Sequence, residues 1–362
     1  MRRFGGNDHP RPIGRPTCRT VFRWLPVLVL TVTLAACGGT AAVHGSGPRS
    51  SAPPTSGPPP TASSSTGVPS TAAGALHFAR PQALSRGTAL VSVSCGSATS
   101  CVALDASGRA YHFDGSSWSA PVPSSAQAIG AGAISVSCAE PTLCMAVATA
   151  GNQVVSWNGQ QWSTPVTLSG ATGLGAVGCA PTGYCATVDA EGNAFAFGGQ
   201  AWHATSNDWG SVSAISCVSA TLCMSVSGGI SQWNGQTWTQ PASFGTTSSF
   251  SGVSCPTVSF CSAVDQGGQA LQWNGLHWSA PSPIEAASDS ATALGVEPTG
   301  VSCPATTVCV AVDNAGGAVQ WLAGSRSRTV IDPGGQLSSI SCPTPSFCVA
   351  VDKAGRVLTG RP

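Results

Sequence analysis

The chain has 362 residues, of which 44 are glycine and 27 are proline, and only 8% are charged. So few charged side chains cannot cover the exposed faces of many helices, and the composition predicts an all-β protein rich in turns. From Cys37 onward nine basic and 13 acidic residues remain, a net charge of about −4. Nucleic-acid binding is therefore disfavoured, because phosphate contacts need a dense basic surface.

The first 36 residues have the features of a bacterial secretory signal. Six arginines precede an apolar run over 24–36, and its 13 residues are too few for a permanent membrane-spanning helix. The run ends at Leu34-Ala35-Ala36-Cys37, which resembles the lipobox of bacterial lipoproteins. The resemblance implies that residues 1–36 are removed and that Cys37 carries the lipid. This lipid would anchor the protein to the cell membrane, facing the extracytoplasmic side. The alternative is a secreted protein cleaved near Ala36.

Residues 37–74 consist almost entirely of Gly, Ala, Ser, Thr, Pro and Val. Such a segment cannot bury a hydrophobic core, and we expect a disordered tether. As a flexible coil its ends would lie roughly 35 Å apart.

The remainder, residues 75–362, is organised by seven pairs of cysteines, each with five residues between its members. Successive pairs are separated by about 40 residues, a period that with strand-like content is typical of β-propeller blades. The sequence therefore predicts a seven-bladed β-propeller. The pairs are Cys95 and Cys101, Cys138 and Cys144, Cys179 and Cys185, Cys217 and Cys223, Cys255 and Cys261, Cys303 and Cys309, and Cys342 and Cys348.

Each pair is expected to form a disulfide across the hairpin between the first two strands of a blade. A metal site is the alternative, but metal-ligand pairs are usually two to four residues apart and few histidines accompany these cysteines. We therefore expect no metal and no cofactor. Each small disulfide loop would contribute on the order of 2 kcal/mol to stability.

Four strands can be assigned within the unit at residues 254–281. A first strand ends at Cys255, a second follows Cys261, and a third runs into Asn274-Gly275, a dipeptide that favours a two-residue hairpin turn. The fourth carries the repeated Trp-x-x-Pro. Proline cannot donate to a sheet ladder, so this strand is expected at the outer edge of the blade.

The ends of the repeat array indicate how the ring closes. The seventh unit ends after its third strand, at residues 356–360. Before the first unit, Phe78-Ala79-Arg80-Pro81 precedes Cys95 by 17 residues, the same interval that separates Trp162 from Cys179. We therefore expect the N-terminal segment to supply the outer strand of the last blade.

Recurrent aromatic and acidic residues have two interpretations each. The tryptophans of Trp-x-x-Pro, such as Trp162 and Trp278, are expected to pack between blades, with a sugar-stacking surface as the alternative. The recurrent aspartates precede glycine-containing turns, where their carboxylates can accept turn amides, with calcium binding as the alternative. These aspartates are Asp105, Asp189, Asp265, Asp313 and Asp352.

One face of the ring carries the candidate ligand-binding residues. Turns after second strands share a face with the connections between blades. There Arg109 and Arg356 occupy equivalent positions in neighbouring blades, with Lys353 close by. They are candidates for an anion-binding patch, and two solvated arginines are the alternative. The connection over 282–302, with three acidic residues, is a candidate functional loop.

The repeat pattern Ser-Val-Ser-Cys-Pro, Cys-Val-Ala-Val-Asp, Trp-Asn-Gly and Trp-Ser-x-Pro resembles the cysteine-paired propeller repeats of secreted and surface proteins of actinobacteria and their relatives. The resemblance covers residues 75–362. It implies fold and location more than activity, since the function of these repeats is largely uncharacterised.

Two functions from different classes follow. The first is a non-catalytic binding or scaffolding module, expected to be monomeric, that takes an unknown protein or glycan ligand on the face with the inter-blade connections. A sensor partner of a membrane complex is a variant of it. The second is a sialidase-like glycoside hydrolase acting on envelope or extracellular glycans, which would need an arginine triad, a nucleophilic tyrosine and acidic partners. Tyr111 and Tyr184 are the two tyrosines, no catalytic residue is identified, and binding is favoured over catalysis.

Overall fold

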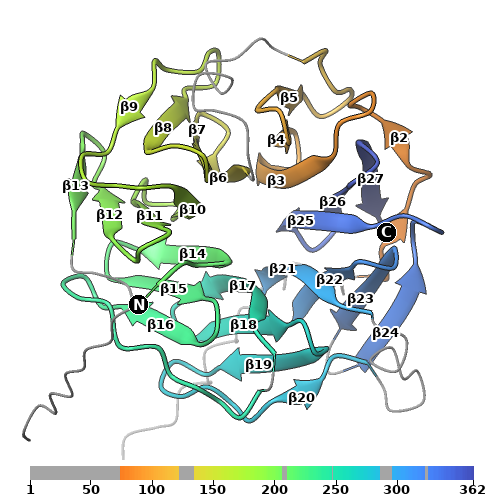
Figure 1. Cartoon of the computed structure of the whole chain (residues 1–362). Helices are drawn as coiled ribbons and strands as arrows, with labels where there is room; N and C mark the ends of the chain where they lie inside the picture. The colour runs from red at the N-terminus through yellow and green to blue at the C-terminus, as the bar shows by residue number, and fades with distance from the viewer. Residues whose placement is uncertain (1–73, 122–133, 206–209, 247, 286–295, 323–324) are drawn as a thin grey trace, which may run out of the picture. The chain divides into compact units, whose positions relative to one another are not determined.

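The computed structural model describes residues 74–121, 134–205, 210–246, 248–285, 296–322 and 325–362. These residues form strands and turns without a helix, and the strands make seven sheets around a central axis (Figure 1). The protein is thus a seven-bladed β-propeller, as the sequence predicts. The signal segment 1–36 and all of the tether except residue 74 lie outside the described residues. Within the described ranges, no helix is long and apolar enough to cross a membrane.

Three antiparallel strands recur in every blade. The innermost strands are β3 (Leu90–Ser97), β6 (Ile134–Glu140), β10 (Leu174–Cys179), β14 (Ala214–Ser219), β17 (Phe250–Thr257), β21 (Pro298–Ala305) and β25 (Leu337–Thr344). The second strands are β4 (Ser100–Asp105), β7 (Leu143–Ala148), β11 (Cys185–Asp189), β15 (Leu222–Val226), β18 (Phe260–Asp265), β22 (Val308–Asp313) and β26 (Phe347–Asp352). The third strands are β5 (Ala110–Phe113), β8 (Gln153–Trp157), β12 (Ala194–Phe197), β16 (Ile230–Trp233), β19 (Gln269–Trp273), β23 (Gly317–Leu322) and β27 (Arg356–Arg361).

The outer strand of a blade depends on whether proline follows its tryptophan. In blades one, two, four and five, Trp-x-x-Pro is present and the tryptophan makes only an isolated bridge to the third strand. Blades three and six lack this proline, and their outer strands are continuous over three and six residues. Proline therefore interrupts the outer strand, because it removes a ladder donor. The outer strands are β9 (Val166–Thr167), β13 (Trp202–Ala204), β20 (Ser282–Pro283) and β24 (Ser325–Val330).

All seven predicted disulfides are confirmed, one in each blade. Each joins the first and second strands near their hairpin turn, with Cα atoms 3.9–4.1 Å apart. The metal alternative for these cysteines is therefore wrong, because both sulfur atoms of every pair are used in the covalent bond. The disulfides join Cys95 with Cys101, Cys138 with Cys144, Cys179 with Cys185, Cys217 with Cys223, Cys255 with Cys261, Cys303 with Cys309, and Cys342 with Cys348.

The position of the disulfides distinguishes the two faces of the ring. In the first blade Cys95 and Cys101 are direct cross-strand partners beside the hairpin turn. The disulfide face, as we call it, carries these hairpins and the Asn-Gly turns. The opposite face, the Asp-turn face, carries the turns between second and third strands.

The hydrophobic core lies between blades. It consists of seven clusters of buried residues, each drawn from two neighbouring blades. Val102 and Leu104 of blade one, for example, pack with Ala146 and Trp162 of blade two. Because each blade buries its faces only against its neighbours, the ring has to close for the last interface to form.

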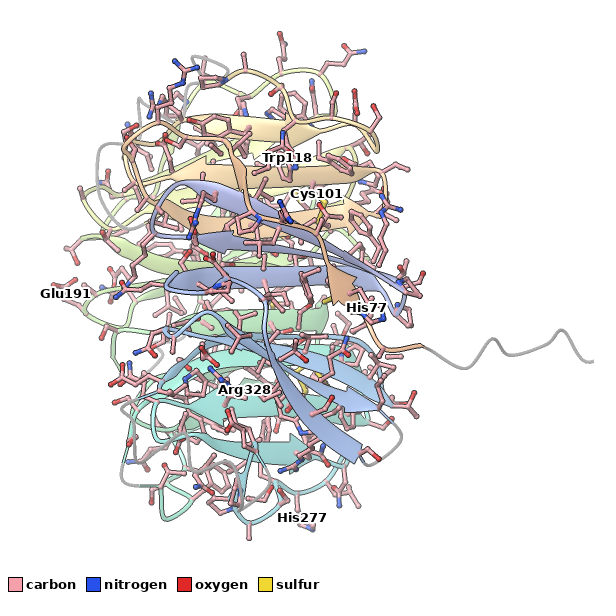
Figure 2. The ribbon with its side chains drawn as sticks, turned by 90° about the vertical axis from the view of Figure 1, so that its right-hand side faces the viewer. His77, Cys101, Trp118, Glu191, His277 and Arg328 are labelled. Atoms are coloured by element: carbon pink, nitrogen blue, oxygen red, sulfur yellow. A yellow bond between two sulfur atoms is a disulfide. The ribbon has the colours of Figure 1, made fainter. Side chains whose placement is uncertain are left out.

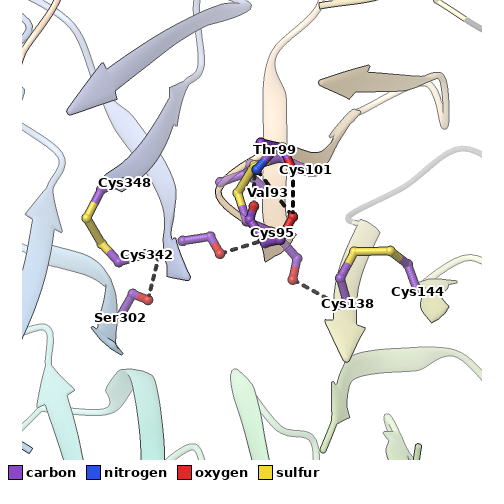
Figure 3. Close-up of a disulfide and its surroundings, with 12 residues drawn as sticks. Val93, Cys95, Thr99, Cys101, Cys138, Cys144, Ser302, Cys342 and Cys348 are labelled. Carbon is purple, nitrogen blue, oxygen red and sulfur yellow. Dashed lines mark hydrogen bonds between the residues drawn. A yellow bond between two sulfur atoms is a disulfide. The ribbon is translucent and has the colours of Figure 1, made fainter. Parts of the chain in front are cut away.

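Serine hydroxyls join the innermost strands around the axis. The serine before the first cysteine of one blade accepts a hydrogen bond from the N–H of the first cysteine of the next blade (Figure 3). These contacts satisfy backbone donors on the edge that faces the channel, which would otherwise lack a partner. The pairs are Cys95 with Ser341, Cys138 with Ser94, Cys179 with Ser137, Cys255 with Ser216, Cys303 with Ser254 and Cys342 with Ser302, at 2.8–3.0 Å.

The ring of serines has one exception, between blades three and four. Gly178 occupies the serine position there, and a Cβ at Gly178 would lie 2.8 Å from the carbonyl oxygen and side chain of Ile215. A serine would not fit without displacing the neighbouring strand, so glycine allows the closer approach.

The N-terminal segment closes the ring as predicted. Strands β1 (His77–Phe78) and β2 (Gln82–Ala83) both pair antiparallel with β27, so the seventh sheet contains both ends of the repeat array (Figure 1). Phe78 packs on Gly360, where a Cβ would lie 2.9 Å from its ring. Leu76 is 9% exposed and belongs to the core between blades six and seven. His77 pairs with Arg361 at the end of β27, which places it toward the disulfide face, opposite Glu191 (Figure 2).

Replacing Leu76 by alanine tests this closure. We expect Leu76→Ala to lower the free energy of unfolding by about 2 kcal/mol, because it leaves a cavity between blades six and seven. Urea denaturation of the purified protein measures the change. His77→Ala is the matched control, since this neighbouring side chain is exposed and its loss should change stability by less than about 0.5 kcal/mol. Equal stability of the two variants would contradict the closure.

Candidate functional site

Buried aspartates organise the turns of the Asp-turn face. In five blades the last residue of the second strand is an aspartate that is at most 3% exposed. Oδ1 of Asp313 accepts hydrogen bonds from the backbone N–H groups of Ala315 and Gly317 at 2.9 and 2.8 Å. The prediction that these carboxylates bond turn amides is confirmed. In the other four blades, Oδ1 of the aspartate likewise accepts a hydrogen bond from the backbone N–H of the residue four positions later in the chain. These aspartates are Asp105, Asp189, Asp265 and Asp352.

Arg109 lies over the aspartate of the first blade. Its Nε donates to Oδ2 of Asp105 at 2.7 Å, and one terminal nitrogen donates to the hydroxyls of Ser85 and Thr88. Burial raises the pKa of Asp105, but hydrogen bonds from Ser107 and Arg109 outweigh it and place this pKa below its usual value. The guanidinium thus stabilises the turn, and its side chain is 32% exposed.

Arg356 has one more carboxylate beside it than Arg109. Its Nε donates to Oδ2 of Asp352 at 2.5 Å, and a terminal nitrogen donates to both oxygens of Asp332 at 2.8 and 2.9 Å. Asp332 comes from the connection between blades six and seven and is 1% exposed. Burial and then hydrogen-bond contact with Asp352 raise the pKa of Asp332 to about 6, against the opposing charge of Arg356. Two buried carboxylates therefore share one arginine.

The predicted anion-binding residues Arg109, Arg356 and Lys353 do lie on one face, in the neighbouring blades seven and one. Lys353 is exposed. Both guanidinium groups, however, already bind carboxylates of the turns that carry them. Anion binding by this patch stays a prediction. The sequence reasoning missed Asp332, whose connection is outside the repeat pattern.

The candidate loop over 282–302 is described only at its two ends. Glu285 forms an ion pair with Nε of Arg328 at 3.1 Å, and Arg328 also pairs with Asp313 at 2.9 Å. The backbone N–H of Glu297 donates to the side chain of Asn314. Asp289 lies outside the described residues. An arginine that bridges two carboxylates is thus present in blade six as well as in blade seven.

The residues required for a sialidase-like reaction do not form a site in the described part of the chain. Tyr111 is 1% exposed, and its hydroxyl donates to Oδ2 of Asp105 at 3.1 Å. Tyr184 lies in the disulfide hairpin of blade three, and burial raises its pKa to about 12. The three arginines Arg109, Arg328 and Arg356 belong to three different blades and bind three different turn aspartates.

Metal binding has no support among the described residues. They contain no group of three or more His, Cys, Asp or Glu side chains placed to hold one ion. All cysteines of the propeller are in disulfides.

The central channel has a volume of about 380 Å³ and is lined by the seven innermost strands. Its walls consist of uncharged small residues, chiefly serine, valine and glycine. Several of the serines already accept hydrogen bonds from the next blade. The strands that line the channel thus also form the contacts between blades. None of the lining residues carries a charge that could recognise a ligand.

The recurrent aromatics pack between blades, as predicted. Trp233 and Trp238 are buried in the core between blades three and four, with ring centroids 5.7 Å apart. Grooves lie between the outer parts of some neighbouring blades. The groove between blades one and two has a volume of about 370 Å³, and the groove between blades four and five about 360 Å³.

His112 covers the aromatic wall of the first of these grooves. Its ring stacks on Trp157 at 3.9 Å, and its Nε2 accepts a hydrogen bond from the indole of Trp162 at 3.2 Å. Burial lowers the pKa of His112 to about 4, so the imidazole is neutral and able to accept this bond.

Comparison with known proteins supports the fold alone. No protein-family model and no curated protein matches the sequence. Among solved structures, similarity extends to a catalytically inactive virginiamycin B lyase from Staphylococcus aureus with quinupristin (TM-score 0.66, 8% identity, 79% of this chain and 100% of that one). It also extends to YCF48 bound to D1 peptide (0.61, 13%, 79% and 97%) and to U3-55K (0.63, 10%, 78% and 98%).

The raised pKa of Asp332 predicts a pH dependence of stability. Asp332 takes up its proton more readily in the folded protein than in the unfolded chain, where its pKa is about 3.9. Its stabilising contribution is therefore complete below about pH 4 and is lost as the pH rises through about 6, by up to about 3 kcal/mol. In the variant Asp332→Asn this side chain cannot ionise, so its contribution to stability does not change with pH. Relative to the variant, the wild type should lose stability between about pH 4.5 and about pH 7.5 in urea denaturation.

The control for this prediction is Glu191→Gln, which changes an exposed carboxylate in the turn of blade three (Figure 2). This variant should keep the pH profile of the wild type. If the difference in stability between wild type and Asp332→Asn is the same at both pH values, the pKa of Asp332 is not raised in the folded protein, and the prediction is wrong.

Proposed function

We propose that this protein is a non-catalytic binding or scaffolding β-propeller, held at the extracytoplasmic side of the cell membrane by a lipid on Cys37. The main support is that its buried charged side chains bind one another within the protein. The buried carboxylates and the arginines that face them bond turns and neighbouring connections, so a rigid frame carries the exposed loops. The lipobox-like Leu34-Ala35-Ala36-Cys37 and the low-complexity segment after it support the anchor.

The proposed ligand is a protein or peptide. One structure with this fold, that of YCF48, has a peptide bound, and this supports the idea that the fold presents a peptide-binding surface. The propeller would act as a monomer, at the end of a tether that precedes β1 in the chain. Assignment to the actinobacterial lipoproteins with this repeat is part of the same proposal.

The carboxylate pair Asp332 and Asp352 does not favour the hydrolase alternative. One carboxyl with a raised pKa beside a second carboxylate is an arrangement that acid catalysis uses. These two side chains, however, are 1% and 0% exposed and bind Arg356. A glycan therefore cannot reach either carboxyl without rearrangement of the turn.

Fractionation of cells that express the protein tests the anchor. The wild type is expected in the membrane fraction and Cys37→Ala in the soluble extracytoplasmic fraction or as unprocessed precursor, because two or more acyl chains hold a protein on the membrane. Cys18→Ala is the matched control, since this cysteine lies in the segment that would be removed. An unchanged membrane fraction for Cys37→Ala would contradict lipidation.

Binding without turnover tests the function itself. The purified protein is applied to a glycan array and an immobilised peptide library, and is incubated with a panel of fluorogenic glycosides. We expect saturable binding to a defined ligand class and no release of fluorophore. Glycoside turnover that is lost in Asp332→Asn or Tyr111→Phe would overturn the non-catalytic proposal.

A further inference from the structure

We propose that the disulfide face of the propeller lies against the lipid surface of the membrane, with the tip of blade five as its point of contact. This inference rests on the anchor in the proposed function and goes beyond it, because it states which side of the ring meets the membrane. The blade-five tip consists of two turns, one between β17 and β18 at Val258 and one after β19 at Leu276.

The blade-five tip presents two large aliphatic side chains to solvent. Val258 is 58% exposed and Leu276 is 74% exposed. The turns that carry them adjoin, since a Cβ at Gly275 would lie 3.3 Å from Cα of Ser259. The indole N–H of Trp273 also donates to the carbonyl oxygen of Val258 at 3.2 Å, which ties the first turn to the strand that leads into the second. The two side chains therefore belong to one apolar surface on a rigid support.

Both aliphatic residues depart from the repeat, and they do so in the same blade. Serine or glutamine stands at the position of Leu276 in blades one to four, and alanine, threonine or proline at the position of Val258 in the other six blades. The second turn does not need leucine, because Oδ1 of Asn274 accepts the backbone N–H groups of Leu276 and His277 at 2.9 and 2.8 Å. Exposed aliphatic side chains that the turns do not require indicate contact with an apolar partner.

The place where the N-terminal segment joins the propeller indicates that this partner is the membrane. Gly360, near the end of β27, pairs with Cys348 of the seventh disulfide, so β27 ends at the disulfide face. A Cβ at Gly74 would lie 3.7 Å from the side chain of Pro362, which places the first described residue at the same face. The residues that link the propeller to Cys37 therefore join it on the side that carries the blade-five tip, and a lipid on Cys37 brings that side to the membrane.

The distribution of charge supports the same orientation. Within the described ranges, the turns of the disulfide face in blades three to seven contain no Asp or Glu, and Arg361 at the end of β27 is exposed. On blades one and two this face carries Asp114 and Glu140. The Asp-turn face, in contrast, carries the turn aspartates together with Glu191 and Asp332. Anionic headgroups repel carboxylates, so a protein with a net charge of about −4 from Cys37 onward approaches a lipid surface most favourably through the disulfide face.

The anchor makes a small contact sufficient. Two aliphatic side chains by themselves bind a bilayer weakly, because the stabilisation is proportional to the apolar area that leaves water. A flexible segment between Cys37 and the propeller would keep the tip at an effective concentration on the order of mM near the lipid surface. Docking of the blade-five tip would then leave the Asp-turn face, with its connections between blades, directed away from the membrane and accessible to a ligand.

Hydroxyl-radical footprinting read by mass spectrometry tests the contact, since it reports the exposure of individual side chains. The protein purified from membranes is reconstituted on vesicles of phosphatidylcholine and phosphatidylglycerol, and Cys37→Ala in solution is the reference. The rate of oxidation of Leu276 should be about threefold lower on vesicles, as expected for a tethered domain that is docked most of the time. Val166 is the internal control: it is 47% exposed, lies in the outer strand β9, and should be oxidised equally in both samples.

A double variant separates docking from anchoring. Val258→Thr combined with Leu276→Gln introduces residue types that other blades have at these positions and retains Asn274, which holds the turn. On vesicles this variant should still be anchored, but the exposed His277 should be oxidised at its rate in solution. Gln236→Ser, in the equivalent turn of blade four, is the matched control and should leave His277 as protected as in the wild type.

The remaining outcomes would overturn the inference in distinguishable ways. Wild type that is attached to the vesicles with Leu276 unprotected would show that the anchor is right and the docking is wrong. Protection on native membranes but not on protein-free vesicles would assign the blade-five tip to a partner protein. Protection of Leu276 in solution that grows with protein concentration would assign it to a second copy of the chain. Wild type that does not attach to vesicles at all would remove the anchor and this inference together.

Discussion

The propeller depends on how each innermost strand pairs its channel-facing backbone groups with the next blade. A strand edge with free N–H groups is costly when buried and prone to wrong pairing when exposed. Here the hydroxyl of Ser94, for example, accepts the N–H of Cys138 across the blade boundary. The contact needs a small side chain with one acceptor, which explains why serine precedes the cysteine in most blades. At every blade boundary except that between blades three and four, it also links the position of a disulfide to the inter-blade contact.

The second constraint is closure, because the core lies between blades and not within them. A linear array of seven units would leave two blade faces uncovered, each rich in valine, leucine and aromatic side chains. Both ends of the repeat array meet in the seventh sheet, and Leu76 extends the closure into the core between blades six and seven. The same sequence pattern, Leu-His-aromatic, closes the ring at residue 76 and lies exposed at residue 276.

Departures from the repeat therefore carry the functional information, and they differ in how they could be recognised. Arg109 and Arg356 were found from the sequence because they occupy equivalent positions in neighbouring units. Asp332 was not, because it lies in a connection without a repeated pattern and acquires its role only through contact with Arg356. Leu276 was not singled out from the sequence either, because the groove that it lines is built by two blades together.

The sequence by itself determined the number of blades, the disulfide pairing, the turn aspartates and the strand that closes the ring. These features follow from local spacing, which repeats seven times and needs no knowledge of distant contacts. Only the tertiary structure decided which side chains meet outside the repeat pattern: Asp332 of the connection between blades six and seven beside Arg356, and His112 of blade one over Trp157 of blade two. Such contacts join different segments of the chain, and their distances are set by the closed ring.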